Sequence, residues 1–226
     1  MYLHVDNNQS SLSSLIIYNI TSMTVDIPKL YIDSVVFESF ISSSYGSVLY
    51  ANNMIVVNLS NSVFTNSIAV NGGSLYFNNT INSSVTITGC QFNNNRAKVY
   101  GGAIYYDSNN YNIKIMSSAF FNNTAVSGGG GGVFLYSNNK NIMILHTNFT
   151  SNEAYRAGAI LFYGSLQESV YIFNSTFISN FAVSKTGINF IVLLIITYLL
   201  YLLTLIQIAL LCTHLLLINF YCYYVI

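Results

Sequence analysis

Apolar and polar positions alternate in short runs from residue 30 to residue 187, and turns rich in Asn, Ser and Gly separate the runs. Alternation over a few residues is typical of β-strands, because successive side chains of a strand point to opposite faces. The three- and four-residue spacing of an amphipathic helix is missing throughout this region. The pattern therefore predicts an all-β region built from short strands.

The strand pattern repeats. Six phenylalanines mark the period, at intervals of 27, 28, 28, 29 and 28 residues: Phe37, Phe64, Phe92, Phe120, Phe149 and Phe177. An asparagine follows three residues after each of the last four, at Asn95, Asn123, Asn152 and Asn180. An alanine follows five residues after each of the last five. A fixed period in this range indicates a solenoid of stacked repeats.

Each repeat predicts one coil of a right-handed parallel β-helix, with about six coils in all. Parallel strands need a long connection, and a solenoid provides it by returning the chain through two other faces. Equivalent residues then lie on top of one another at the strand spacing of about 4.8 Å. We expect the phenylalanine rings to stack in the core and the asparagine amides to form a hydrogen-bonded ladder at a corner.

A small pair and an apolar triplet follow each of the first five phenylalanines, in YGSVLY, GGSLYF, GGAIYY, GGVFLY and AGAILF. We expect glycine in the pair to allow positive φ or close backbone approach, at Gly72, Gly73, Gly101, Gly102, Gly131, Gly132 and Gly158. Alternation along the triplet places its first and third residues in the core. The middle residues are expected to face outward as a row: Leu49, Tyr76, Tyr105, Leu135 and Leu161.

Two interpretations of this outward row stay open. The row is a patch that binds a protein or glycan partner, or another copy of the chain, because a contiguous exposed apolar row exceeds what monomers usually show. Alternatively, the row reflects only the suitability of such residues for an exposed strand.

The repeats also contain paired tetrapeptides. FNNN (92–95) and FFNN (120–123) match the pattern FxxN, and GGAI (101–104) matches GGA[ILV], with AGAI (157–160) as a variant. Paired at this spacing, they resemble the repeats of the chlamydial polymorphic outer membrane proteins. Similar repeats occur in large surface proteins of some eukaryotes, and the Asn-, Ile-, Phe- and Tyr-rich composition fits a ciliate better than a chlamydia. The resemblance covers residues 30–187 and implies a β-helical region exposed at the cell surface and involved in adhesion.

The chain departs from the bacterial pattern at its end. Residues 188–226 are uniformly apolar, carry no charged side chain and exceed the ~20 residues needed to span a bilayer. We expect a transmembrane helix near residues 190–211, with the lipid bilayer as its partner and the repeats on the extracellular side. Residues 1–29 are expected to form a partial N-terminal coil. Translated AT-rich non-coding DNA has a similar composition, so a truncated gene model is an alternative interpretation of the tail.

Charge and candidate chemistry argue against catalysis. Seven basic and seven acidic residues give zero net charge, without the basic clusters that bind nucleic acid. Glycoside cleavage requires facing carboxylates about 5–10 Å apart, but the acidic residues fall in different columns of the repeat: Asp33, Glu38, Asp107, Glu153 and Glu168. The three histidines share no column, and Cys90 lies in a column of small residues as a packed thiol. We expect no catalytic, cofactor-binding or metal site, and a fragment of a β-helical carbohydrate-active enzyme is the alternative.

Overall fold

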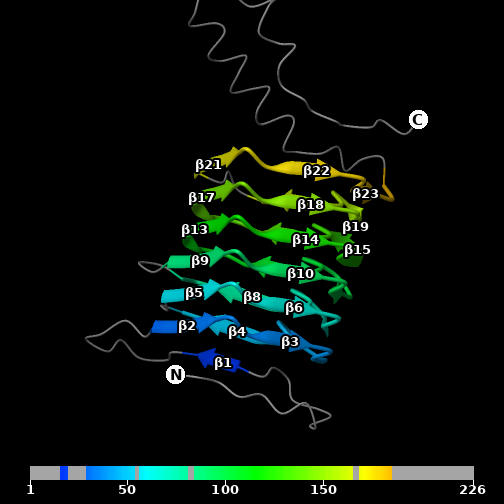
Figure 1. Ribbon diagram of the computed structural model, residues 1–226. Coiled ribbons are helices and arrows are strands. Elements are labelled where there is room, and N and C mark those ends of the chain that lie inside the picture. The colour runs from blue at the N-terminus through cyan, green and yellow to red at the C-terminus, as the bar shows by residue number, and fades with distance from the viewer. Residues whose placement is uncertain (1–15, 20–28, 54–55, 81–83, 165–167, 185–226) are drawn as a thin grey trace, which may run out of the picture.

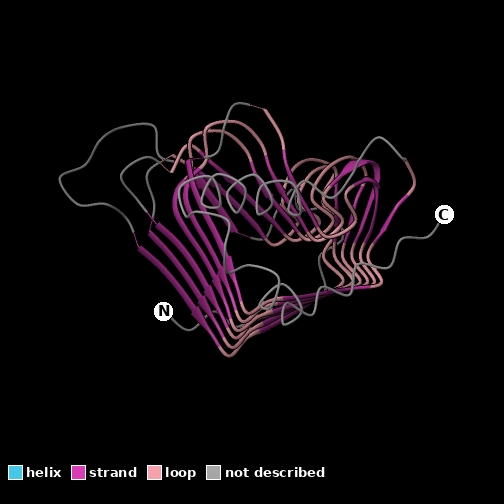
Figure 2. Ribbon diagram, turned by 90° about the horizontal axis from the view of Figure 1, so that it is seen from above, coloured by secondary structure: helices cyan, strands magenta, loops and turns pink. Residues whose placement is uncertain are grey.

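The computed structural model describes residues 16–19, 29–53, 56–80, 84–164 and 168–184, in which all regular secondary structure is β-strand. The strands lie in four parallel sheets along one stack of coils (Figure 1). Within a coil the chain passes through the four sheets in turn, which we name B, C, D and A in that order. Successive coils overlie one another when seen from above (Figure 2). The six strands of sheet B mark out five full turns and the start of a sixth. The expected all-β parallel solenoid is confirmed, with about five turns, while its right-handed winding stays a prediction.

The strands of each sheet stack in chain order. Sheet A contains β1 (Ile16–Asn19), β4 (Leu49–Asn52), β8 (Leu75–Asn78), β12 (Ile104–Tyr106), β16 (Val133–Leu135) and β20 (Ile160–Phe162). Sheet B contains β2 (Lys29–Asp33), β5 (Val56–Ser60), β9 (Ser84–Thr88), β13 (Tyr111–Met116), β17 (Lys140–Leu145) and β21 (Glu168–Phe173). Sheet C contains β3 (Val36–Glu38), β6 (Val63–Thr65), β10 (Gln91–Asn93), β14 (Ala119–Phe121), β18 (Asn148–Thr150) and β22 (Thr176–Ile178). Sheet D contains β7 (Ile68–Ala69), β11 (Arg96–Ala97), β15 (Thr124–Gly129), β19 (Glu153–Arg156) and β23 (Phe181–Ala182).

A corner after each phenylalanine strand gives the coil four faces instead of the three expected. The residue that turns the chain from sheet C toward sheet D has a positive φ of 53–62° in every coil: Ser39, Asn66, Asn94, Asn122, Ser151 and Ser179. A second positive-φ column turns the chain from sheet B into sheet C: Ser34, Asn61, Gly89, Ser117, His146 and Asn174. The left-handed region is costly for most side chains but is entered by Gly and Asn more readily. Five of the twelve residues in these two columns are asparagines.

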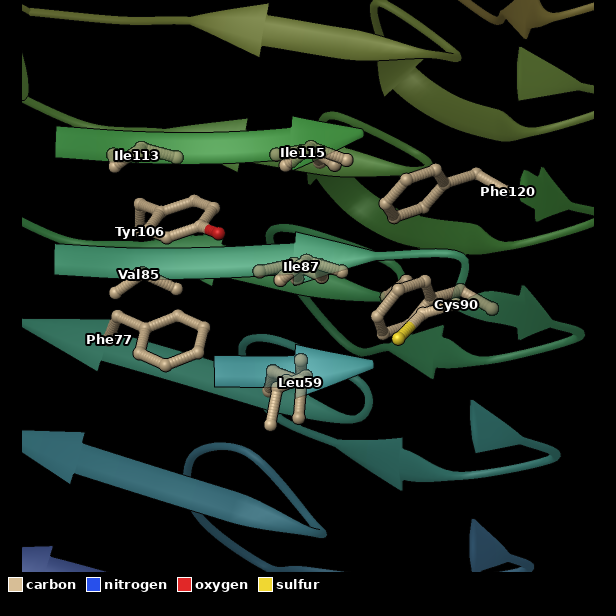
Figure 3. Packing of buried hydrophobic residues seen from close by; sticks show 14 of the residues in the cluster. Leu59, Phe77, Val85, Ile87, Cys90, Tyr106, Ile113, Ile115 and Phe120 are labelled. Carbon is tan, nitrogen blue, oxygen red and sulfur yellow. The ribbon is translucent and has the colours of Figure 1, made fainter. Parts of the chain in front are cut away.

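The phenylalanine column forms one wall of the core. Consecutive rings from Phe37 to Phe177 stack at centroid distances of 4.7–5.1 Å, with interplanar angles of 15° or less. Aliphatic columns from sheet B, including Val85 and Ile113, pack in the same cluster (Figure 3). Phe77 and Tyr106 from sheet A stack at 5.0 Å and complete the cluster. The core therefore consists of side chains that contact their own counterparts one coil away.

The expected asparagine ladder is present at the corner between sheets C and D. The Asn123 side chain is fully buried, and its Nδ2 donates to the Phe92 carbonyl at 2.8 Å and to Oδ1 of Asn152 at 2.9 Å. Its Oδ1 accepts from the backbone nitrogen and the Nδ2 of Asn95, at 2.9 and 3.0 Å. The same pattern links Asn152 to Asn180. Each amide thereby supplies hydrogen-bond partners for backbone groups at the corner, which lie outside the regular strand pairing.

A second amide ladder, which the sequence analysis did not identify, closes the corner between sheets A and B. Thr80, Asn110 and Asn139 are fully buried. Oδ1 of Asn139 accepts from the backbone nitrogen of Asn110 at 3.0 Å and from its Nδ2 at 2.8 Å. Oδ1 of Asn110 in turn accepts from the Thr80 hydroxyl at 3.1 Å. This ladder lies in the links between sheets A and B. The number of residues between each phenylalanine and the next link varies among the repeats, so the equivalent positions do not recur at a fixed spacing in the sequence.

Small polar side chains form a third ladder between sheets B and C. The Thr147 hydroxyl donates to the Leu145 carbonyl two residues earlier at 2.9 Å, and Ser118 makes the equivalent bond to Met116. Each hydroxyl also accepts from the backbone nitrogen of the preceding coil's counterpart. Cys90 occupies this column, and its pKa is raised by burial. The predicted packed thiol is therefore a ladder member, with its Sγ 3.6 Å from the Thr88 carbonyl.

Sheet A corrects the sequence-based register in two coils. The structure pairs Leu49 with Leu75, and Ile104 with Val133. Leu49 and Leu135, which were expected to face outward, instead lie in the main core with at most 1% exposure. Two features of the sequence explain the difference. A run of five glycines (128–132) allows several alignments, and small Ala51 fills a core position that Phe77, Tyr106 and Phe162 occupy in other coils.

The glycine pairs require the same correction. Positive φ falls on Gly72, Gly101 and Gly130, at 63–68°, so the pair in that last coil is Gly130–Gly131 instead of Gly131–Gly132. The second glycine of each pair lies against the next coil. A Cβ on Gly102 would collide with the Gly131 carbonyl oxygen, and one on Gly131 would collide with that of Gly158. The pair thus combines a left-handed turn with close backbone approach.

The tail at 188–226, including the span expected near 190–211, and most of the partial coil expected at 1–29 lie outside the described residues. Strand β1 is the described part of that N-terminal region, and it pairs with β4. Within the part of the chain that the structure describes, no helix has the length and apolarity required to cross a membrane.

We predict that Asn123→Leu lowers the free energy of unfolding by about 1–3 kcal/mol, because it leaves buried corner groups unpaired. Urea unfolding of the full chain in mild detergent measures the loss. Gln91→Leu is the matched control, since Gln91 is exposed on β10, and we expect it to change the value by about 0.5 kcal/mol or less. Equal effects of the two substitutions would contradict the ladder.

The third ladder contains Cys90, Ser118 and Thr147, and we call it the hydroxyl column. We also predict that Cys90→Ser and Cys90→Val distinguish the contribution of hydrogen bonds in this column to stability from the contribution of side-chain shape. Serine restores the donor and acceptor found elsewhere in the column, so stability should stay within about 1 kcal/mol of the parent. Valine has the shape of the Thr147 side chain without its hydroxyl and should cost about 1–3 kcal/mol. Urea unfolding under the same conditions measures both variants. A valine variant as stable as the serine variant would contradict the assignment of Cys90 to a hydrogen-bonded column.

Candidate functional site

The outward face of sheet A carries a continuous column of apolar side chains. The middle residue of each strand points away from the main core, and the register places five of them in line: Tyr50, Tyr76, Tyr105, Phe134 and Leu161. Tyr76, Tyr105 and Leu161 belong to the row expected from the sequence. Tyr50 and Phe134 take the places assigned to Leu49 and Leu135. We call these five residues the outer column.

The outer column is covered, which the sequence did not predict. Four of its members are 1–7% exposed and form a second hydrophobic cluster, against which Tyr50 packs. Tyrosines from flanking turns cover it: the Tyr45 ring lies 4.6 Å from that of Tyr76, and the Tyr100 ring lies 4.5 Å from that of Phe134. Such contacts come from turns whose lengths vary among the repeats, so the repeat pattern carries no signal for them.

The aromatic rings of the outer column present their edges outward. Tyr50, Tyr76, Tyr105 and Phe134 stack in sequence at 5.1–5.2 Å, with interplanar angles of 6–13°. Each inner ring therefore has its two faces occupied by its neighbours along the axis. A sugar ring or a cation needs an open aromatic face for stacking. The arrangement consequently favours a structural role for these rings over a role as a binding platform.

One hydrogen bond ties this cluster to a charged side chain. The Tyr76 hydroxyl donates to Oδ2 of Asp107 at 2.5 Å. Burial, and then the hydrogen bond to Asp107, raise the pKa of Tyr76 far above its usual value. Burial likewise raises the pKa of Tyr105. Both phenols therefore stay protonated at physiological pH, and the Tyr76 phenol is the donor to Asp107.

The other acidic residues that the structure describes lie in separate columns. Asp33 accepts hydrogen bonds from Ser60 at 2.6 Å and from Asn61 at 3.0 Å, which lower its pKa. Arg96 and Glu153 share a column of sheet D, with Thr124 between them. Among the described residues, no group of three His, Cys, Asp or Glu side chains could hold a metal ion.

The fold defines the chain as a protein of the parallel β-solenoid class. No protein-family model, no curated protein and no solved structure matches it.

We predict that Phe134→Ala lowers the free energy of unfolding by about 3–5 kcal/mol, the cost of removing a buried phenylalanine. Phe121→Ala is the matched control, since Phe121 is 48% exposed on sheet C and its loss should cost about 1 kcal/mol or less. Urea unfolding measures both. Similar small losses would show that the outer column is open to solvent.

Proposed function

We propose that the chain is a membrane-anchored surface protein whose β-solenoid serves as a rod with an adhesive or structural role and without catalytic activity. One observation carries the proposal: the recurring side chains of each coil are used by the neighbouring coils. Phenylalanines stack on phenylalanines, and asparagine amides bond to asparagine amides. A repeat of this kind builds length, at about 4.8 Å for each coil.

The sequence beyond the solenoid supports the anchor. Residues 187–226 contain no Asp, Glu, Lys or Arg, and their number is about twice that needed to cross a bilayer once. The resemblance of the repeats to those of surface proteins supports an extracellular position for the solenoid. The partner in adhesion is then a protein or glycan on another surface, or a second copy of the chain.

The surface of the middle coils supports recognition through uncharged polar groups. Outward positions of sheets B and C include Asn58, Thr86, Gln91 and Asn93. Amide and hydroxyl side chains donate and accept hydrogen bonds without the salt dependence of charged patches.

We predict that the full chain resists extraction from membranes at alkaline pH, because its apolar tail would have to leave the bilayer. The experiment expresses the full chain and a variant that stops after Thr186 in the same eukaryotic cells, followed by carbonate extraction and immunoblotting. The full chain should stay in the membrane pellet, and the shortened chain should appear in the soluble or secreted fraction. Extraction of the full chain with the peripheral proteins would contradict the anchor.

A further inference from the structure

The exposed surface of the solenoid changes character at its C-terminal end. Five large apolar side chains there are 50–55% exposed: Tyr171, Phe173, Ile178, Phe181 and Val183. The first four lie on strands of three different sheets, and Val183 follows directly after β23. We call these five residues the apolar collar. Its strands β21, β22 and β23 form the last described coil, at the opposite end from β1 (Figure 1).

The register shows that the collar occupies columns that carry mostly polar side chains in the middle coils. On sheet B, the column that ends in Tyr171 begins with Tyr31 and continues through Asn58, Thr86, Lys114 and Met143. On sheet D, the column that ends in Phe181 runs through Arg96, Thr124 and Glu153.

Two further columns change in the same direction. The column that ends in Ile178 contains Glu38, Thr65, Asn93, Phe121 and Thr150. The column that ends in Phe173 contains Asp33, Ser60, Thr88, Met116 and Leu145. Of the coils that the structure describes, only the last carries an apolar residue in all four of these columns.

The first described coil is different, although it also exposes apolar residues. Tyr31 and Ile41 are 59% and 67% exposed there, but Asp33 and Glu38 lie among them at exposed positions. Residues 169–184 include no charged side chain; Glu168 precedes them in β21, Lys185 follows them, and the apolar residues 188–226 begin three residues after Lys185. An uncharged apolar collar next to a segment long enough to span a bilayer matches the environment of the membrane interface.

We propose that the last coil lies in the interfacial region of a lipid bilayer, so that the solenoid stands end-on upon the membrane. The proposal rests on the membrane anchor proposed above and adds where the solenoid meets the lipid. Tyr171 supplies an aromatic side chain of the kind enriched in this region, and Phe173 and Phe181 add apolar surface of the kind that interfacial segments bury. The occupant of the collar is therefore lipid, and a second copy of the chain or the segment 185–226 folded back is an outcome for the experiment to detect.

The geometry limits the depth of this contact. One coil is about 4.8 Å high, whereas interfacial segments enter the boundary between headgroups and acyl chains by about 5–10 Å. The last coil fits this depth. The hydrocarbon core is excluded, because the backbone groups at the strand edges of an end coil need hydrogen-bond partners. Headgroups and interfacial water provide them.

The chain contains no tryptophan, so a single introduced tryptophan reports its own surroundings. The experiment incorporates the full chain into phosphatidylcholine vesicles and compares Tyr171→Trp with Tyr31→Trp. These positions belong to the same outward column at opposite ends of sheet B and are 52% and 59% exposed. Lipids that carry a quencher near the headgroup, and soluble acrylamide, are the probes, while circular dichroism checks that both variants are folded.

We expect the lipid quencher to lower the emission of the Tyr171→Trp variant, with a blue shift and protection from acrylamide. The Tyr31→Trp variant should respond to acrylamide alone. Protection of Tyr171→Trp from both probes would overturn the proposal in favour of cover by protein, and full access to acrylamide would overturn it in favour of an exposed collar.

Flotation of the vesicles separates this inference from the anchor. If the chain floats with the vesicles but Tyr171→Trp is not quenched by lipid, the anchor stands and the collar contact is wrong. If the chain does not float, the anchor fails and the collar contact fails with it.

Discussion

Backbone hydrogen bonding between positions one coil apart is the constraint on which the rest of the structure depends. Parallel pairing in constant register places each residue on its own counterpart, as Phe92 lies between Phe64 and Phe120. A residue type persists in a column only if it packs or bonds with itself. Phenylalanine, isoleucine and asparagine meet this condition, whereas like charges directly opposite each other are unfavourable. The low share of charged residues in the chain, 6%, is consistent with this requirement.

The corners show why the amides are asparagines. At each corner the backbone leaves one sheet before it enters the next, and its polar groups need partners other than the regular strand pairing. An asparagine supplies two donors and a two-site acceptor. Asn123 uses both donors and accepts two hydrogen bonds. Aspartate has no donor when ionised and would repel its counterpart in the next coil. The hydroxyl column with Cys90 and the ladder from Thr80 to Asn139 solve the same problem at the other corners.

The sequence predicts the features that this constraint imposes on every coil. The phenylalanine and asparagine columns appear at fixed spacing, and the structure has both. Sheet A follows a stretch of variable length, so Leu49 and Leu135 were assigned to the wrong face by one residue. The cover over Tyr76 and Phe134 comes from Tyr45 and Tyr100 in irregular turns, which no period describes. The collar was not predicted from the sequence, because only the strand register shows which residues of earlier coils share the columns of Tyr171 and Phe181.

Because equivalent residues stack in constant register, the distance between two residues of one column depends on the number of coils between them. Residues 31 and 171 lie five strand spacings apart on sheet B, so their Cα atoms should be about 24 Å apart at about 4.8 Å for each step. Spin labels at Tyr31→Cys and Tyr171→Cys, in a chain whose native cysteines are replaced by serine, test this by electron–electron double resonance. The account predicts one narrow distance distribution near that value, widened only by the label linkers. A broad distribution, or a distance displaced by more than one strand spacing beyond the reach of the linkers, would contradict the stacking of equivalent residues.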